Sequence, residues 1–158
     1  MNIALFDALK GTINGEDDNG IDRFVCAHAI MLGLEGIPGI YVHSLLATGN
    51  DYQRMENTGH NRSINRQKFS SAELRQRLAI NDSKQRAVFE GYQKLLGIRC
   101  HQKAFHPEGA QAMLNIADPR VLGFQRTSPD GQQNVVVLAN FSHQNVMIPL
   151  PSGVGERI

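Results

Sequence analysis

The chain has 158 residues, of which 41% are hydrophobic and 20% are charged, and its formal net charge is +1. These values are typical of a globular protein of about one domain and exclude an intrinsically disordered chain. The near-neutral charge gives no reason to expect nucleic acid as a partner. The N-terminus lacks the pattern of a signal peptide, and the longest apolar-rich stretch, residues 24–34, is far shorter than the ~20 residues that cross a bilayer. We therefore expect a cytoplasmic protein that makes no contact with a membrane.

The first elements in chain order are a helix and a strand. An apolar helix is predicted over residues 22–34, and Gly33 and Gly36 are natural stops for it. Residues 37–46 then form a continuous apolar run without alternation, which is typical of a strand covered on both faces of a parallel sheet. This helix and this strand form one repeat of an α/β fold, and one repeat cannot close a sheet.

Two further helices are predicted after a polar loop. Ser70 and Glu73 have the spacing of a capping box, which predicts a short helix that ends near Leu78. Asn81 or Asp82 can cap a longer helix that ends at about residue 100, with apolar residues recurring on one face.

From about residue 107 short strands alternate with turns. Strands are predicted over residues 121–126 and 134–140, on either side of a type I turn at residues 128–131, and a third over residues 146–150. Three strands make only a marginal sheet. The predicted fold class is therefore α/β followed by all-β, with the boundary between residues 106 and 107.

Asn50 and Asp51 are candidate ligand-binding residues because they follow the predicted strand. Ligands of α/β sheets bind at the carboxyl ends of the strands. The sequence Gly-Asn-Asp is equally common as a turn, in which the side chains bond to their own backbone. Both interpretations stay open at this point.

Arg62 and Arg66 are a second candidate pair, with Arg54 upstream of them. A planar guanidinium group can hold a phosphate, a carboxylate or vicinal hydroxyls through two parallel hydrogen bonds. The alternative is a solvated basic loop, or arginines that pin the loop by salt bridges to Asp51 and Glu56.

Other chemistry finds little support. The six histidines include no i, i+4 pair and neither cysteine has a CxxC partner, so we expect no metal and no cofactor. Cys26 lies in an apolar helix, where its thiol is expected to be protonated and inert, and both cysteines are expected to stay reduced. There is no GxSxG motif, P-loop or GxGxxG motif, and hence no recognisable nucleophile.

A family resemblance is strongest over residues 36–66 and extends upstream to Phe6. The strings GIPGIYVHSLLA, GND and NRSINR closely resemble the sucrose phosphorylase-like branch of glycoside hydrolase family 13, the α-amylase family. The branch includes sucrose and glucosylglycerate phosphorylases, and the resemblance covers nearly the whole chain. It implies that residues 1–106 are the C-terminal segment of a (β/α)8 catalytic barrel, with its last strand at about 37–42. Residues 107–158 would then be the incomplete start of an antiparallel β domain.

The resemblance also implies a function. Enzymes of this family transfer a glucosyl group with retention, using one carboxylate as nucleophile and another as acid/base. These carboxylates come from barrel strands upstream of the residues present here, so no catalytic residue is expected in this chain. We expect a fragment of a phosphorylase that converts an α-glucoside and phosphate to glucose 1-phosphate. Alone, without the missing N-terminal barrel segment, it should be inactive.

The family pattern assigns roles to the candidate residues. Arg62, which follows Asn61 where relatives have glycine, corresponds to an arginine at the glucose-binding pocket. Asp51 is expected near it, Asn50 supports the loop, and Arg66 holds the loop in place.

Two alternatives stay open. One is a stand-alone non-catalytic module that binds sugar or forms a homo-oligomer through exposed apolar surface. The other is a fragment of a hydrolase or transglucosylase of the same family. The natural glucoside and its leaving group are not specified by these residues.

Overall fold

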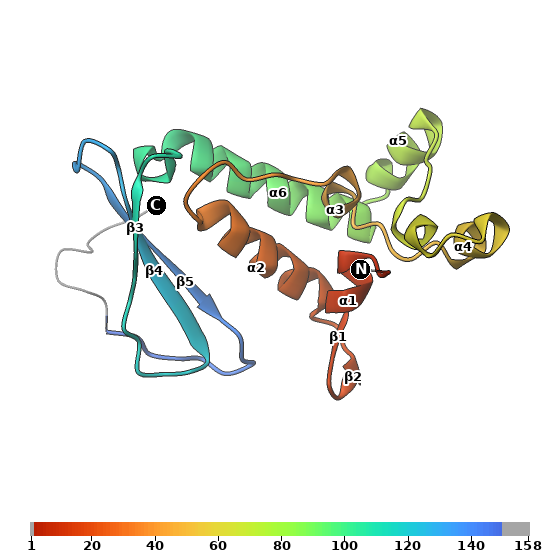
Figure 1. Ribbon diagram of the computed structural model, residues 1–158. Coiled ribbons are helices and arrows are strands. Elements are labelled where there is room, and N and C mark those ends of the chain that lie inside the picture. The colour runs from red at the N-terminus through yellow and green to blue at the C-terminus, as the bar shows by residue number, and fades with distance from the viewer. Residues whose placement is uncertain (1, 150–158) are drawn as a thin grey trace. The chain divides into compact units, whose positions relative to one another are not determined.

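A computed structural model describes residues 2–149 of the chain (Figure 1). The chain divides into two compact units. Unit 1 comprises residues 1–28 and 39–95, and unit 2 comprises residues 29–38 and 96–158. The predicted boundary between residues 106 and 107 refers to domains of a longer enzyme and stays a prediction.

Short elements make up most of unit 1. They are α1 (Leu5–Leu9), β1 (Gly11–Thr12), β2 (Gly15–Glu16), α3 (Val42–Leu45), α4 (Tyr52–Thr58), the 3-10 helix η1 (Asn61–Asn65) and α5 (Ser71–Ala79). The longer helices α2 (Gly20–Gly33) and α6 (Lys84–His101) begin in unit 1 and end in unit 2. Unit 2 adds η2 (Lys103–Phe105), β3 (Ala110–Met113), β4 (Val121–Thr127) and β5 (Asn134–Asn140).

The core of unit 1 is aromatic. The ring centroids of Phe6 and Phe24 are 5.3 Å apart, those of Phe24 and His28 are 4.4 Å apart, and those of His28 and Tyr92 are 4.9 Å apart. Phe24 and His28 both belong to this group of rings because they lie four residues apart, on one face of α2. Burial lowers the pKa of His28, so its imidazole is neutral at pH 7. The core thus holds together one face of α2, one face of α6 and the helix α1.

The three predicted helices are confirmed. Helices α2, α5 and α6 match the expected ranges within a few residues. The capping box at α5 is formed in full: the Ser70 hydroxyl accepts from the Glu73 backbone N–H at 3.2 Å, and the Glu73 carboxylate accepts from the Ser70 backbone N–H at 2.8 Å. These helices were predictable because their signals lie within the helix itself.

The buried strand predicted over residues 37–46 is wrong for this structure. Residues 37–41 belong to no helix or strand, and residues 42–45 form the short helix α3. Ile37 is 85% exposed and Val42 is 53% exposed. A strand of a parallel sheet needs neighbouring strands to take its backbone hydrogen bonds, and no described residue pairs with this segment.

Unit 2 contains an antiparallel sheet in the order β3-β4-β5. The predicted hairpin is confirmed as β4 and β5, in register with Phe124 opposite Val137. The turn between them closes where the Gly131 N–H donates to the Ser128 carbonyl at 2.8 Å, and Gly131 has a φ of +68°, which glycine adopts without strain. The sheet packs on a small core of Ala104, Phe105 and Val135.

The third strand is not the predicted one. It is β3, and the described part of the predicted strand, residues 146–149, is not in a strand; Leu150 lies outside the described residues. Pro149 removes a backbone donor from that segment, which disfavours a strand interior. The prediction missed β3 because Ala-Gln-Ala-Met contains no β-branched or aromatic residue.

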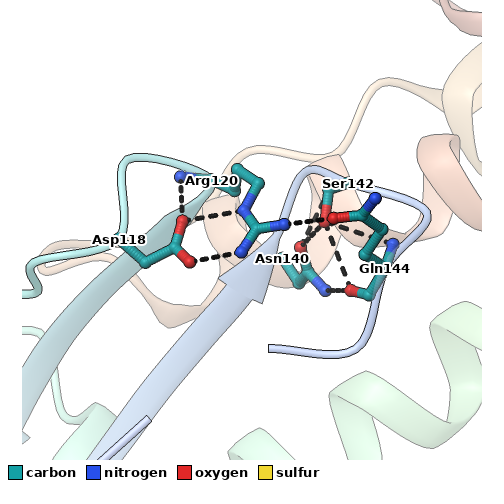
Figure 2. A network of polar contacts seen from close by, with 5 residues as sticks. All are labelled: Asp118, Arg120, Asn140, Ser142 and Gln144. Carbon is teal, nitrogen blue, oxygen red and sulfur yellow. Dashed lines mark hydrogen bonds and ion pairs between the residues drawn. The ribbon is translucent and has the colours of Figure 1, made fainter. Parts of the chain in front are cut away.

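A polar network holds the chain where it leaves β5 (Figure 2). The guanidinium group of Arg120 donates to both oxygens of Asp118, at 2.9 and 2.6 Å, and to the Gln144 side chain at 2.5 Å. The Asn140 amide donates to the Gln144 carbonyl at 2.8 Å. Arg120 holds the pKa of Asp118 down at about 2. The network thus fixes residues that follow β5 without adding them to the sheet.

Two arginines of unit 2 reach the end of α2. Arg126 is fully buried and donates to the carbonyl of Gly33 at 3.0 Å, and Arg99 donates to the carbonyls of Leu32 and Gly36. The last carbonyls of a helix lack partners within the helix and carry partial negative charge. The two cations therefore cap the C-terminus of α2.

Among the helices that the structure describes, none is both long enough and apolar enough to span a membrane.

Candidate functional site

The chain reaches the candidate loop through a tight buried turn in unit 1. Leu46, Ala47 and Thr48 are 5%, 0% and 3% exposed. The Thr48 N–H donates to the His43 carbonyl at 2.9 Å, and Ala47 has a φ of +46°, in the left-handed region that residues other than glycine rarely adopt. Such strain persists only where the surroundings fix the backbone, so the path of the following loop is well determined.

Asn50 clamps the loop onto the N-terminal segment. Its backbone N–H donates to Asp7 Oδ2 at 2.5 Å, and its side-chain Oδ1 accepts from the backbone N–H of Ala4 at 2.7 Å. Gly49 makes room for this contact, because a Cβ there would lie 3.2 Å from both oxygens of Asp7. Loop support by Asn50, as the family pattern implies, is thus consistent with its contacts.

Asp51 is the N-cap of α4. Its Oδ1 accepts from the Arg54 backbone N–H at 2.9 Å, and its own N–H donates to the Ile64 carbonyl at 2.7 Å. The first contact starts the helix, and the second ties the loop to η1. The side chain therefore has a local structural task, and its predicted contact with substrate stays a prediction.

Three arginines share a polar hollow in unit 1. Arg54 comes from α4, Arg62 from η1 and Arg66 from the residue after η1, and the hollow has a volume of about 530 Å³. The remaining lining residues are Asn2, Gly59, His60, Asn61 and Ser63. The structure thus brings together the two predicted arginines and adds Arg54, while Asn50 and Asp51 are not among the lining residues.

The three guanidinium groups have no carboxylate partner among the described residues. Within residues 2–149, none of the ion pairs includes Arg54, Arg62 or Arg66. The salt bridges to Asp51 and Glu56 that the sequence left open are therefore not formed. Arg62 and Arg66 are exposed, and Arg54 is half-buried. The hollow offers cationic hydrogen-bond donors to solvent or to a ligand.

Arg54 is the residue that sequence reasoning passed over. Its Nε is buried and has no hydrogen-bond partner in the described part of the chain. Buried donors are nearly always paired, so an unpaired one indicates a missing partner. No signal in the sequence marks this atom, because its burial depends on how α4 and η1 pack.

A second, more apolar hollow of about 260 Å³ lies elsewhere in unit 1. Its lining residues are Ile3, Ala4, Leu5, Phe6, Tyr41, His43, Ser44, Thr48 and Asn65. The Tyr41 hydroxyl donates to the Asn65 carbonyl at 3.2 Å, and burial lowers the pKa of His43. The hydrogen bond from Tyr41 ties the segment before the loop to η1.

Metal chemistry gains no support from the geometry. The described residues contain no group of three or more His, Cys, Asp or Glu side chains that could hold a metal ion. Cys26 is half-buried in α2, and burial raises the pKa of its thiol, so it is protonated at neutral pH.

The chain is similar to curated phosphorylases over most of its length. It is 42% identical to the glucosylglycerate phosphorylase of Spirochaeta thermophila over 132 residues, which are 84% of this chain and 22% of that protein. It is 33% identical to the glucosylglycerate phosphorylase of Escherichia coli over 131 residues, 83% of this chain and 23% of that protein. The chain thus spans about a fifth of the length of these relatives. No family model matches it.

A solved structure shares the fold. The sucrose 6F-phosphate phosphorylase from Thermoanaerobacter thermosaccharolyticum superposes with a TM-score of 0.63 at 23% identity, over 77% of this chain and 22% of that one. Helices followed by an antiparallel sheet thus match a part of that enzyme's fold. The chain is thus similar in sequence to a portion of these phosphorylases and shares the fold of a portion of one of them. The chain belongs to the sucrose phosphorylase-like branch of glycoside hydrolase family 13, as its motifs indicated.

Proposed function

We propose that this chain is the C-terminal portion of a cytoplasmic, retaining α-glucoside phosphorylase and that Arg62 forms part of its glucosyl-binding pocket. Residues 1–106 would complete the barrel, with residues 37–42 becoming its last strand once a neighbouring strand is present. The reaction would transfer a glucosyl group from an α-glucoside to phosphate. The catalytic carboxylates would lie in the N-terminal barrel segment, so the chain alone should not turn over.

The observation that carries the proposal is that Arg62 is exposed and makes no ion pair with any residue from 2 to 149, in a chain whose curated relatives are named as phosphorylases. An arginine that served only to fix the loop would be expected to make an ion pair or a backbone contact. In this structure the loop is held by Asn50 and Asp51, which leaves the Arg62 guanidinium group available for a sugar hydroxyl.

The test is a chimera in which this chain replaces the matching 132 residues of the Spirochaeta thermophila enzyme. We expect it to form glucose 1-phosphate from glucosylglycerate and phosphate. Arg62→Ala should lower kcat/KM about ten- to a hundredfold, because a hydrogen bond to a charged group contributes about 1.5–3 kcal/mol. Arg75→Ala is the matched control, because Arg75 is an exposed arginine of α5.

Near-normal kcat/KM in the Arg62→Ala chimera would remove Arg62 from the pocket. A chimera that hydrolyses the glucoside with no dependence on phosphate would replace the phosphorylase proposal by the hydrolase alternative. A folded chimera with neither activity would contradict both.

Self-association is a second candidate property of the isolated chain. Tyr41, Val42 and Tyr52 are large side chains of unit 1 that are 49%, 53% and 58% exposed. Contiguous apolar surface marks sites of association, and these side chains would supply it if they adjoin. Size-exclusion chromatography with light scattering tests it: a dimer or higher oligomer supports the property, and a monomer at all concentrations rejects it.

A further inference from the structure

We propose that the open edge of β5 is the contact surface for a second copy of this chain, and that two β5 strands pair across it in antiparallel order. The sheet of unit 2 would then continue from one copy into the other. This inference does not rest on the proposed function. It concerns a surface of unit 2, whereas the arginine hollow and the exposed apolar side chains described above belong to unit 1.

β5 is an edge strand without the usual protection. It comes last in the sheet order β3-β4-β5, so β4 pairs with one side of it and no described strand pairs with the other (Figure 1). Its seven residues pair with β4 in unbroken register. Edge strands of natural proteins are usually short, bulged, or marked by lysine or proline. β5 contains no charged residue, no proline and no bulge, so it can accept another strand.

The ladder shows which backbone groups of β5 point away from β4. One step beyond the strand, the Phe141 N–H donates to the Arg120 carbonyl at 2.8 Å. Hydrogen-bonded pairs recur at every second residue of an antiparallel ladder, so the odd-numbered residues of β5 bond to β4. The even-numbered residues, including Val136 and Leu138, direct their N–H and C=O groups to the open edge. No described residue bonds to these groups of Val136 or Leu138, which are therefore available to a further strand.

The sequence of β5, Asn-Val-Val-Val-Leu-Ala-Asn, points to a second copy as the partner. It reads almost alike in both directions from its central residue, Val137. Antiparallel pairing of two copies about Val137 therefore places Asn134 opposite Asn140, and Val136 opposite Leu138. Amide then meets amide, apolar side chain meets apolar side chain, and no like charges oppose each other. The same register sets the outward-facing groups of one copy against those of the other, so a copy satisfies the backbone and the side chains together.

The contact is symmetric and small. A two-fold axis through the centre of the two strands makes it closed, so it gives a dimer and not a filament. The four even-numbered residues of each copy would form about eight backbone hydrogen bonds across the edge. Interfaces at the low end of the size range bind weakly, so we expect a dissociation constant of about 10–100 μM.

Amide hydrogen exchange of the 158-residue chain, read residue by residue, tests the assignment. The N–H groups of Val136 and Leu138 should exchange about three- to sevenfold more slowly at about 500 μM than at about 5 μM chain, because the monomer fraction falls by that factor. At the lower concentration their exchange should approach that of an open chain. The Val137 N–H, which bonds to β4, should stay protected at both concentrations.

Two lysine variants form a matched pair. Leu138→Lys and Met113→Lys each replace an exposed apolar residue, and the two residues lie on opposite edge strands of one sheet. The proposed register makes residue 138 of one copy a diagonal neighbour of residue 138 of the other, so two lysines repel there. In sedimentation velocity, Leu138→Lys should weaken dimerisation at least about tenfold, and Met113→Lys should change it less than about twofold.

A mixing experiment tests the symmetry of the contact. Leu138→Glu should be monomeric for the same reason as Leu138→Lys. An equimolar mixture of these two variants should form dimers, because opposite charges then meet across the edge. Circular dichroism checks that each variant is folded before mixing. Recovery of the dimer would show that neither substitution acts by unfolding the sheet.

Each part of the experiment can overturn the inference. Slow exchange of Val136 and Leu138 at every concentration would assign the edge to another segment of the same chain. Fast exchange at every concentration would show that nothing pairs with it. Dimers that are weakened by Val42→Lys and not by Leu138→Lys would place the contact on unit 1, and folded charge variants that stay monomeric when mixed would contradict the register. The activity of the chimera bears on the proposed function alone.

Discussion

Arg126 allows the sharpest stability prediction, because it is fully buried and forms no ion pair with a described carboxylate. Its guanidinium group donates to the carbonyls of His106 at 2.9 Å, Gly33 and Gly109 at 3.0 Å, and Ala110 at 3.3 Å. Burial lowers the pKa of Arg126, but an arginine remains protonated at any accessible pH. The four carbonyls are thus the main compensation for a charge removed from water.

The expected effect of Arg126→Met follows from two opposing terms. Each hydrogen bond from a charged donor contributes about 1.5–3 kcal/mol, so four of them outweigh the desolvation of the cation, which costs several kcal/mol. Methionine fills a similar volume without the charge and leaves the four carbonyls without these donors. We expect the free energy of unfolding to fall by about 2–4 kcal/mol.

Urea unfolding followed by circular dichroism measures this change. With a denaturant slope of about 2 kcal/mol/M, the midpoint of Arg126→Met should lie roughly 1–2 M below that of the wild type. Arg75→Met, at an exposed arginine of α5, should shift it by less than about 0.25 M. An Arg126→Met protein as stable as the wild type would contradict this prediction. It would show that the cost of desolvating the cation equals the contribution of its four hydrogen bonds.

Two further predictions concern unit 2. Asp118 has its pKa held at about 2 against an ordinary value of 3.8, because Arg120 bonds its carboxylate, so this pair stabilises the fold above about pH 4 and ceases to do so as the pH falls towards 2. The urea midpoint of Arg120→Gln should therefore lie further below that of the wild type at pH 6 than near about pH 2, where only the bond from Arg120 to Gln144 remains; a constant difference would contradict this. Gly109→Ala places a Cβ 2.8 Å from the carbonyl oxygens of Ala104 and Thr127, and should cost about 1–3 kcal/mol in urea unfolding; an unchanged midpoint would show that the backbone yields there.

Local signals in the sequence predicted the elements that form locally. The helix α5 follows from the Ser70–Glu73 capping box, and the β4–β5 hairpin follows from its turn at residues 128–131. Each signal involves residues a few positions apart, whose contacts form whatever the rest of the chain does.

Signals that depend on distant partners failed. Residues 37–42 have the composition of a buried strand, but a strand exists only where a neighbour takes its hydrogen bonds. Strand β3 has the opposite character: its residues favour no strand, and it forms because β4 offers an edge on which Ala110 pairs with Thr127. In neither case does the sequence of one segment show whether a second segment is present to pair with it.

The candidate site divides in the same way. Arg62 and Arg66 were predicted because they lie in one short motif of the loop. Arg54 was passed over, since only the packing of α4 against η1 shows that its Nε is buried without a partner. A further prediction for Arg66, that it supports the loop, finds no side-chain hydrogen bond or ion pair in the described residues, and it stays a prediction of the family resemblance.

The shape of the arginine loop and turnover should be separable properties of this protein. The loop that carries the arginines is fixed by contacts from Asn50 to Asp7 and Ala4 and from Asp51 to Ile64, all of them within unit 1. None of these contacts needs residues 37–42 to be a strand. The described residues can thus hold the arginine loop in shape by themselves, whereas glucosyl transfer, under the proposed function, needs carboxylates that lie outside them. We accordingly expect the isolated chain to keep the arginine loop in shape and expect product only from a chimera with the complete barrel.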